Sequence, residues 1–249
     1  MTNKKSLLLL LILSTVLVYG STLFNGFVWD DFGLILEDPL VKTDDFSGIF
    51  SRKYYSLQPE EERGRFRPVR HFTFILDHWL YGENAWGYHL TNLFLHAVNV
   101  LLVYIVAGLL FKTNTAALLG ALLFAVHPVH VESVAWVKNR SDLLCSIFFL
   151  VSVWSLFKLK GSKKIIAVSV SFLLAFLSKE TAAVLPALLM ILVGLCWPAE
   201  KKKKEFYWIV PLLLAAAGML LLKEYYWKRE LSPDSNIIFD AYIRLRIVI

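Results

Sequence analysis

Hydrophobic residues in this 249-residue chain are concentrated in about seven blocks that short polar segments separate. A helix needs about 17 or more mostly apolar residues to cross the hydrocarbon core of a bilayer, and most of the blocks reach this length. The pattern therefore predicts an all-α, polytopic membrane helix bundle with about seven spans. The predicted spans are Ser6–Leu23, Leu90–Phe111, Thr115–Val131, Leu143–Phe157, Ile165–Leu177, Thr181–Trp197 and Phe206–Leu222.

The composition agrees with a bilayer environment. Hydrophobic residues make up 57% of the chain and charged residues only 18%, whereas a soluble domain carries roughly 25% charged residues. The net charge of +6 would suit nucleic acid in a soluble protein, but these lysines lie between apolar blocks, so we expect no nucleic acid. By the positive-inside rule, the side with the lysine clusters is cytoplasmic, and so is the N-terminus. The clusters are Lys4–Lys5, Lys112, Lys158–Lys164 and Lys201–Lys204.

The opposite side receives two outer loops, residues 24–89 and 127–142, together with the turn Ser178–Glu180 and the segment Lys223–Asp240, and the two loops hold most of the His, Arg and Asp residues. We expect the chemistry on this side, which faces the periplasm in a bacterial inner membrane, our preferred location, or the lumen in an endoplasmic reticulum membrane. A cleaved signal peptide ending near Gly20 is an alternative to the first span. The apolar tail Ile237–Ile249 predicts a further span cut short by C-terminal truncation, and no repeat domain is expected.

An acidic pair, Asp30 and Asp31, follows the first predicted span. Its aromatic neighbours Phe27, Trp29 and Phe32 favour a raised carboxyl pKa, which suits a general base that takes a proton from a hydroxyl group. The alternative is an aromatic belt at the membrane surface with ordinary solvated acids.

Four arginines precede or begin a predicted amphipathic helix that starts at Pro68, a favoured first helical residue. Guanidinium groups bind phosphate oxygens in a bidentate manner, so the arginines indicate a phosphate or pyrophosphate ligand, with anionic lipid headgroups as the alternative. The arginines are Arg63, Arg65, Arg67 and Arg70. The helix is predicted to lie on the membrane surface through Phe72, Ile75, Leu76, Trp79 and Leu80.

A polar stripe marks the second predicted span. His89, Asn92, His96 and Asn99 are spaced three, four and three residues apart, which puts them on one helix face. Polar groups inside a membrane normally face the bundle interior, so interhelical hydrogen bonding is the main interpretation. Only His89, near the outer surface, is kept as a candidate for substrate binding.

The second outer loop gathers several titratable groups. His127, His130 and Glu132 could ligate a metal, but Pro128 interrupts the helix and the spacing matches no standard zinc pattern, so we predict no metal site. A polar cap over a substrate cleft is the preferred interpretation. Arg140 and Asp142 extend this cap, and Lys179 and Glu180 place a charged pair at the turn after the fifth predicted span.

Taken together, these segments resemble a known family. The chain is similar to the membrane region of the transmembrane-and-tetratricopeptide-repeat O-mannosyltransferases and their bacterial relatives, within the GT-C superfamily of glycosyltransferases. The block His127–Trp136 (HPVHVESVAW) is the most specific part. The other segments that carry the resemblance are Phe27–Asp31, Arg67–Val69, Leu76–His78, Gly87–Asn92, His96, Arg140–Asp142 and Ser178–Glu180.

The resemblance implies an enzyme that moves a mannosyl or related hexose from a polyprenyl-phosphate-linked donor to a hydroxyl group of a protein or glycan acceptor. It implies that Asp30 or Asp31 activates the acceptor, and that Arg67, Arg70, Arg140 and Lys179 meet the anionic donor. It implies no cofactor, with a divalent metal as the lesser alternative. The further candidates for substrate binding are His89, His127, His130, Glu132, Asp142 and Glu180.

Two other functions fit the residues less well. A non-catalytic scaffold or lipid-phosphate carrier would use the same groups only to organise the bundle. A transporter would place charged groups or broken helices near the middle of the membrane, whereas the charges here lie at the outer ends of the predicted spans.

Overall fold

The computed structural model describes residues 4–43, 46–50 and 65–230, and these ranges contain helices and no strand. The all-α fold class is therefore confirmed. The predicted roles of Arg63 and of the tail Ile237–Ile249 lie outside the described residues. The longer helices are α1 (Lys4–Tyr19), α4 (Pro68–Tyr81), α5 (Ala85–Phe111), α6 (Asn114–Val126), α8 (Arg140–Lys158), α9 (Gly161–Ser178), α10 (Leu185–Cys196) and α11 (Ala199–Glu230).

Short helical segments connect the longer helices. The 3-10 helix η1 (Gly20–Phe24) extends α1, and η6 (Glu180–Val184) precedes α10. The first outer loop contains the π-helix η2, the α-helix α2 and the 3-10 helix η3, and the second contains η4, α7 and η5. Their bounds are Phe32–Leu36 (η2), Pro39–Thr43 (α2), Gly48–Phe50 (η3), Pro128–His130 (η4), Val131–Ala135 (α7) and Val137–Asn139 (η5).

Each predicted span coincides with a helix, and the described residues include five helices long and apolar enough to cross a membrane. A sixth span results if α6 and the segment Pro128–Ala135 are counted together, although the chain bends by 49° between them. The sixth predicted span, Thr181–Trp197, corresponds to the apolar helical segment Glu180–Cys196, which is shorter. The five long segments are Lys5–Phe24, Ala85–Phe111, Val137–Lys158, Gly161–Ser178 and Ala199–Leu221.

Local sequence explains where the helices begin and end. The helix α5 starts at Ala85, inside the predicted first outer loop, because the side chain of Asn84 caps it by accepting a hydrogen bond from the backbone N–H of Trp86 at 3.1 Å. The helix α6 ends at Val126 because Pro128 cannot supply the next backbone donor. The predicted third span Thr115–Val131 therefore contains a bend after Val126.

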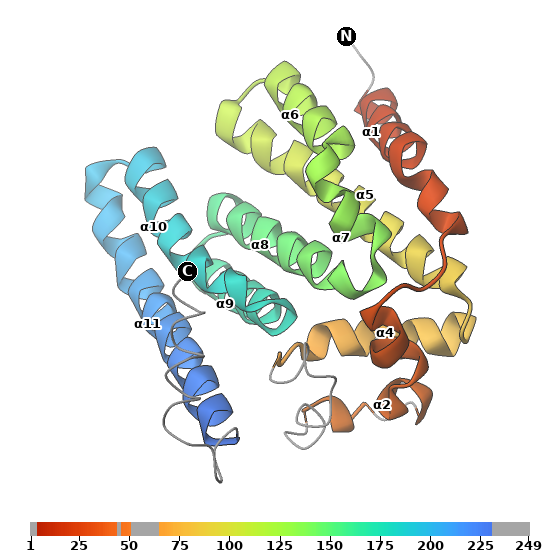
Figure 1. Cartoon of the computed structure of the whole chain (residues 1–249). Helices are drawn as coiled ribbons and strands as arrows, with labels where there is room; N and C mark the ends of the chain where they lie inside the picture. Colours follow the sequence, from red (N-terminus) through yellow and green to blue (C-terminus); the bar gives the residue numbers. More distant parts are fainter. Residues whose placement is uncertain (1–3, 44–45, 51–64, 231–249) are drawn as a thin grey trace.

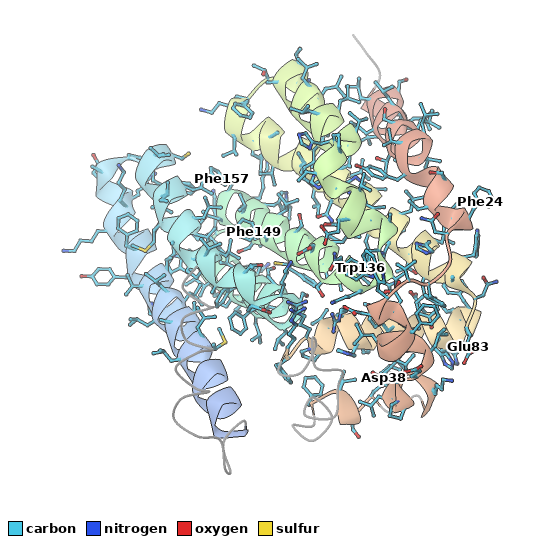
Figure 2. All side chains as sticks on the ribbon, in the orientation of Figure 1. Phe24, Asp38, Glu83, Trp136, Phe149 and Phe157 are labelled. Carbon is cyan, nitrogen blue, oxygen red and sulfur yellow. The ribbon has the colours of Figure 1, made fainter. Side chains whose placement is uncertain are left out.

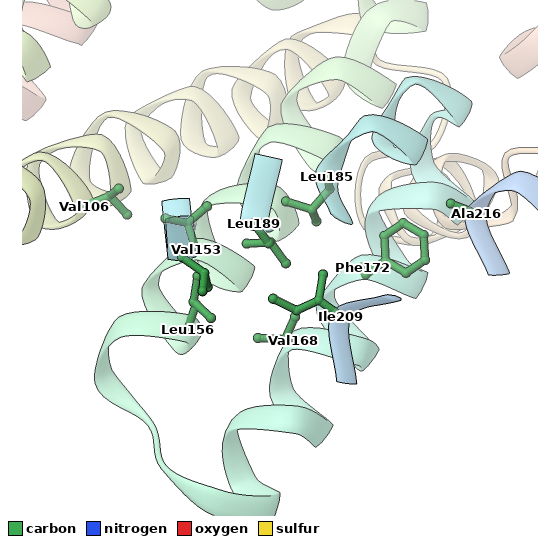
Figure 3. Close-up of a cluster of buried hydrophobic side chains, with 10 residues drawn as sticks. Val106, Val153, Leu156, Val168, Phe172, Leu185, Leu189, Ile209 and Ala216 are labelled. Carbon is green, nitrogen blue, oxygen red and sulfur yellow. The ribbon is translucent and has the colours of Figure 1, made fainter. Parts of the chain in front are cut away.

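The helices pack as two connected groups (Figure 1). The helix α5 packs against α1, α6 and α8, while α8 also packs against α9, and α10 packs against α11. Figure 3 shows the apolar core between α8, α9, α10 and α11, in which Val168 and Phe172 meet Leu185 and Ile209. This core holds the two groups together through α8.

A smaller apolar core supports the outer loops. It joins η2, α2, η3 and α4 to the first turn of α5 and to η5, and its members are Leu34, Ile35, Val41, Ile49, Phe74, Ile75, Tyr88 and Val137. In Figure 1, α2 and α4 lie at the lower right, away from the N-terminal end of α1. The first outer loop is thus a folded platform in the ranges that the structure describes.

The helix α4 has two different faces. Its inner face is partly charged, because Arg70, His71 and Asp77 are buried with Phe74 and Ile75. The predicted membrane-facing residues Phe72, Trp79 and Leu80 are 42%, 71% and 59% exposed, in agreement with a helix that lies on a membrane. The prediction is wrong for Ile75, which is fully buried in the platform core.

A substitution at Gly87 tests how closely α4 packs against α5. A Cβ atom at Gly87 would lie 2.1 Å from Cγ and 2.6 Å from Cβ of Tyr81, so Tyr81 must shift as a whole. We expect Gly87→Ala to lower the free energy of unfolding by about 1–3 kcal/mol, as overpacking does. Thermal unfolding of the purified chain in detergent measures this loss.

The matched control is Gly120→Ala in α6, where an added Cβ meets nothing within 4 Å. This variant should be as stable as the wild type or more stable, since Ala has about 1 kcal/mol higher helix propensity than Gly. Equal unfolding midpoints for the two variants would contradict the close packing of Gly87 against Tyr81.

Candidate functional site

The acidic pair follows a strained residue at the edge of the platform. Trp29 has a φ of 47°, which is unusual for a bulky side chain, and its ring meets the ring of Trp136 edge to face at 5.4 Å between centroids. Such strain persists only where the surrounding structure imposes it and is concentrated at functional sites. In Figure 2, Trp136 lies near the middle of the molecule, and Phe149 and Phe157 of α8 lie to its left.

Asp31 is fully buried and held by the backbone. Its Oδ1 accepts a hydrogen bond from the N–H of Lys138 at 2.8 Å, and its Oδ2 accepts one from the N–H of Val28 at 3.2 Å. Burial raises the pKa of Asp31 to about 6, although these two hydrogen bonds act in the opposite direction. The predicted raised carboxyl pKa is therefore confirmed for Asp31.

Asp30 has a different environment from its neighbour. Its side chain is 22% exposed and forms an ion pair with Nζ of Lys138, whose side chain is only 8% exposed. The Lys138 ammonium also lies 5.0 Å from the ring centroid of Trp136. Lys138 therefore contacts both acids, Asp30 through its side chain and Asp31 through its backbone.

Lys138 is absent from the site residues predicted from the sequence. It is the one lysine of the second outer loop, residues 127–142, and a single cation beside the specific His127–Trp136 block is the signal that could have found it. Its partners Asp30 and Asp31 lie more than 100 positions earlier in the chain, so no local pattern indicates the pairing.

Arg140, at the start of α8, is completely buried. Its Nη2 lies 2.6 Å from Oδ2 of Asp77 in α4 and donates to the carbonyl of Tyr88 in α5 at 2.9 Å. Its Nε donates to Oδ1 of Asn92 at 2.7 Å. The guanidinium thus connects α8, α4 and α5. Arg140, which was predicted to meet the donor, is bonded to groups of the protein itself.

Asp77 completes this buried pair; it lies in the segment Leu76–His78, which carries the resemblance, but was not among the predicted site residues. One carboxylate oxygen faces Arg140, and the other accepts a hydrogen bond from the hydroxyl of Thr91 at 2.8 Å. Burial raises the pKa of Asp77, while the charge of Arg140 opposes the rise.

Two further ion pairs hold the turn between α9 and η6, one to the platform and one to the first turn of α8. Arg67 binds Glu180 in a bidentate manner, with nitrogen–oxygen distances of 3.2 and 3.3 Å, and Lys179 pairs with Asp142. The structure therefore pairs four of the predicted residues with one another. Arg70, also predicted, is fully buried in α4 with its guanidinium 5.8 Å from the ring centroid of Phe74.

The predicted histidines do not form one site. His89 is buried beside the acidic segment, with Nε2 3.4 Å from the carbonyl oxygen of Gly26. His130 instead packs against Phe124, with ring centroids 4.2 Å apart, and Nδ1 of the exposed His127 accepts a hydrogen bond from a backbone N–H. Glu132 is exposed and accepts a hydrogen bond from Asn139 at 2.8 Å.

The polar stripe on α5 faces the bundle interior, as predicted. His89, Asn92, His96 and Asn99 are all 1% exposed or less. Asn92 also donates to the carbonyl of Val134 at 3.2 Å, and Asn99 donates to the carbonyl of Leu143 at 3.0 Å. The amides satisfy backbone carbonyls where neighbouring helices begin or end. Within the ranges that the structure describes, no group of three or more His, Cys, Asp or Glu side chains could hold a metal ion.

The fold and this arrangement define a multi-span membrane protein with a folded outer platform and an acid–lysine pair at its edge. The chain belongs to the dolichyl-phosphate-mannose-protein mannosyltransferase family, whose model matches residues 68–222. No solved structure matches the chain significantly.

The curated relatives named here are longer than this chain. It is 37% identical to human protein O-mannosyl-transferase TMTC3 over 146 residues, which are 57% of this chain and 16% of that protein. It is 35% identical to human TMTC1 over 147 residues, 57% of this chain and 17% of the relative. It is 33% identical to Drosophila melanogaster Tmtc1 over 186 residues, 72% of this chain and 21% of the relative. The chain thus matches about a fifth of their length or less.

The buried Arg140–Asp77 pair should be essential for stability. We expect Arg140→Gln to lower the free energy of unfolding by about 3–5 kcal/mol, because it leaves a buried carboxylate without its cation. Thermal unfolding in detergent measures the change. Lys42→Gln, which breaks the exposed Lys42–Glu83 ion pair, is the control and should leave the midpoint unchanged. Equal losses in both variants would contradict the structural role of Arg140.

Asp31 should give stability a specific pH dependence. Its pKa is about 6 in the fold and about 3.9 in an unfolded chain, so between these values the folded chain binds more protons and stability falls as pH rises. Asp31→Asn cannot titrate. Relative to the wild type, we expect this variant to gain about 2 to 3 kcal/mol between about pH 4 and pH 7, measured by unfolding at each pH. A difference that is flat across this range would contradict the buried, titrating Asp31.

Proposed function

We propose that this chain forms the catalytic membrane region of a mannosyltransferase, which moves a mannosyl group from a polyprenyl-phosphate-linked donor to a hydroxyl group of a protein or glycan acceptor. The acid–lysine pair Asp30–Lys138 at the platform edge is the observation that carries the proposal. The family and the names of the relatives, protein O-mannosyl-transferases, support the sugar and the kind of acceptor.

In this proposal Asp30 is the general base. Asp30 is more exposed than Asp31, so an acceptor hydroxyl can approach Asp30 and lose its proton to it as the bond between the hydroxyl oxygen and the sugar carbon forms. Asp31 is a positioning residue, because both its oxygens accept backbone hydrogen bonds and its side chain is fully buried. The Asp31–Lys138 backbone contact keeps Lys138 beside Asp30.

Lys138 is the group proposed to meet the donor phosphate. As the bond between sugar and phosphate breaks, negative charge accumulates on the leaving phosphate, and a nearby cation stabilises it. The ammonium of Lys138 is close to the proposed base, so a donor phosphate beside Lys138 would bring the sugar near an acceptor hydroxyl at Asp30. Arg67 and Lys179 are further candidates, each paired with a carboxylate.

The outer side of the membrane is the proposed site of reaction. The lysine clusters in the connections on the other side support this orientation through the positive-inside rule. The membrane is then a bacterial inner membrane or that of the endoplasmic reticulum, with the N-terminus in the cytoplasm.

The test measures transfer of radiolabelled mannose from a polyprenyl-phosphate donor in membranes prepared from cells that express the gene encoding this chain. We expect Asp30→Asn to lower transfer by about a hundredfold or more, as loss of a general base does. Asp31→Asn should lower transfer less. Lys138→Gln should raise the donor concentration that gives half-maximal transfer. Glu37→Gln, which changes an exposed acid of the same loop, is the control at equal expression.

Unchanged transfer in Asp30→Asn would remove Asp30 as the base, and a larger loss in Asp31→Asn would assign that role to its neighbour. Donor binding without transfer in the wild type would instead favour a lipid-phosphate carrier.

A further inference from the structure

A cavity of about 320 Å³ lies between the first turns of α9 and the first turns of α11. Both helices are candidate membrane spans, and this is the end of the bundle that the lysine clusters predict to be cytoplasmic. The cavity is lined by Lys160, Gly161, Lys164, Ile165, Lys201, Lys204, Glu205 and Trp208.

The lining has a strong excess of positive charge. Lys160, Lys201 and Lys204 are exposed at the rim, whereas Lys164 is buried and its charge is matched by Glu205. The three rim lysines therefore have no carboxylate among the lining residues to neutralise them. An anion is the ligand that such a rim favours.

The base of the cavity is a fixed polar group. Nζ of Lys164 lies 2.5 and 2.6 Å from the two oxygens of Glu205, and the indole N–H of Trp208 donates to the same carboxylate at 2.8 Å. One turn further into the bundle, Val168 of α9 and Ile209 of α11 continue the contact in the apolar core (Figure 3). The position of the two helices, and so of the lysines, is fixed by this packing.

We propose that this cavity binds the anionic phosphate headgroup of a membrane lipid. Its place at the ends of two span-length helices puts it at the level of the headgroups, where tryptophan is enriched. Lysine side chains pack their methylene stems along apolar surface and keep the ammonium group in water, so the rim lysines suit a ligand that is apolar on one side and anionic on the other. The proposal does not rest on the proposed transferase function.

The lysine run 201–204 makes it possible to distinguish a specific lipid site from a surface that is only basic. Lys201 and Lys204 are three residues apart on α11, on one helix face, and both line the cavity. Lys202 and Lys203 belong to the same run but do not line it. General attraction of a polybasic segment to anionic lipid would use all four equally.

The experiment compares two variants of equal net charge, Lys201→Gln/Lys204→Gln and Lys202→Gln/Lys203→Gln, each purified in a neutral detergent. Dioleoyl phosphatidic acid is titrated into each protein and bound lipid is counted by native mass spectrometry, with dioleoyl phosphatidylcholine and inorganic phosphate as the comparison arms. We expect the first variant to bind phosphatidic acid about tenfold or more weakly than the wild type, and the second within about twofold. Phosphatidylcholine should bind more weakly than phosphatidic acid to the wild type.

Three outcomes would overturn the proposal. Equal losses in the two variants would mean attraction to the basic segment as a whole. Inorganic phosphate that displaces the lipid completely at similar concentration would mean a site for free phosphate. No preference of the wild type for phosphatidic acid over phosphatidylcholine would mean that the rim lysines bind no anionic lipid.

Discussion

The buried guanidinium of Arg140 connects the outer platform to the membrane bundle. A charged group taken out of water costs several kcal/mol unless charge and hydrogen bonds compensate it, and here Asp77, Asn92 and the carbonyl of Tyr88 provide both. These partners come from α4 and α5, while Arg140 itself begins α8. The guanidinium can be satisfied only when three helices are docked together, so the pair favours one arrangement of the platform over alternatives.

The position of the acidic pair depends on this docking. Lys138 precedes Arg140 by two residues in η5, and its backbone N–H holds Asp31 while its ammonium holds Asp30. Where α8 is fixed by Arg140, the segment before it is fixed as well. The strain at Trp29 fits this view, because a backbone in an unfavourable conformation persists only when both its flanks are held.

The sequence was most informative where a pattern is local. Apolar blocks located the helices, and the three- and four-residue spacing of His89, Asn92, His96 and Asn99 correctly assigned one buried face of α5. The raised pKa of Asp31 also followed from its aromatic neighbourhood, although burial, which no short segment reveals, is its largest cause. The failures concern contacts between distant segments. Asp77 and Lys138 were not among the predicted site residues, because their partners are far away in the chain. Ile75 was placed on the membrane side because it shares the helical spacing of Phe72 and Trp79, and the sequence does not show the platform core that covers it.

The ion pairs of the outer side suggest how donor binding and base activation could be coupled in the proposed reaction. A phosphate that binds a cation with a carboxylate partner competes with that carboxylate, and the cost of displacing the carboxylate rises with burial. Arg140 is completely buried among several partners, whereas the Lys138–Asp30 pair is partly open to solvent on the side of Asp30. The exchange is therefore easiest at Lys138. A phosphate that takes over this ammonium releases Asp30 at the moment when a donor is in place, so the proposed base becomes available to an acceptor hydroxyl only beside a loaded site.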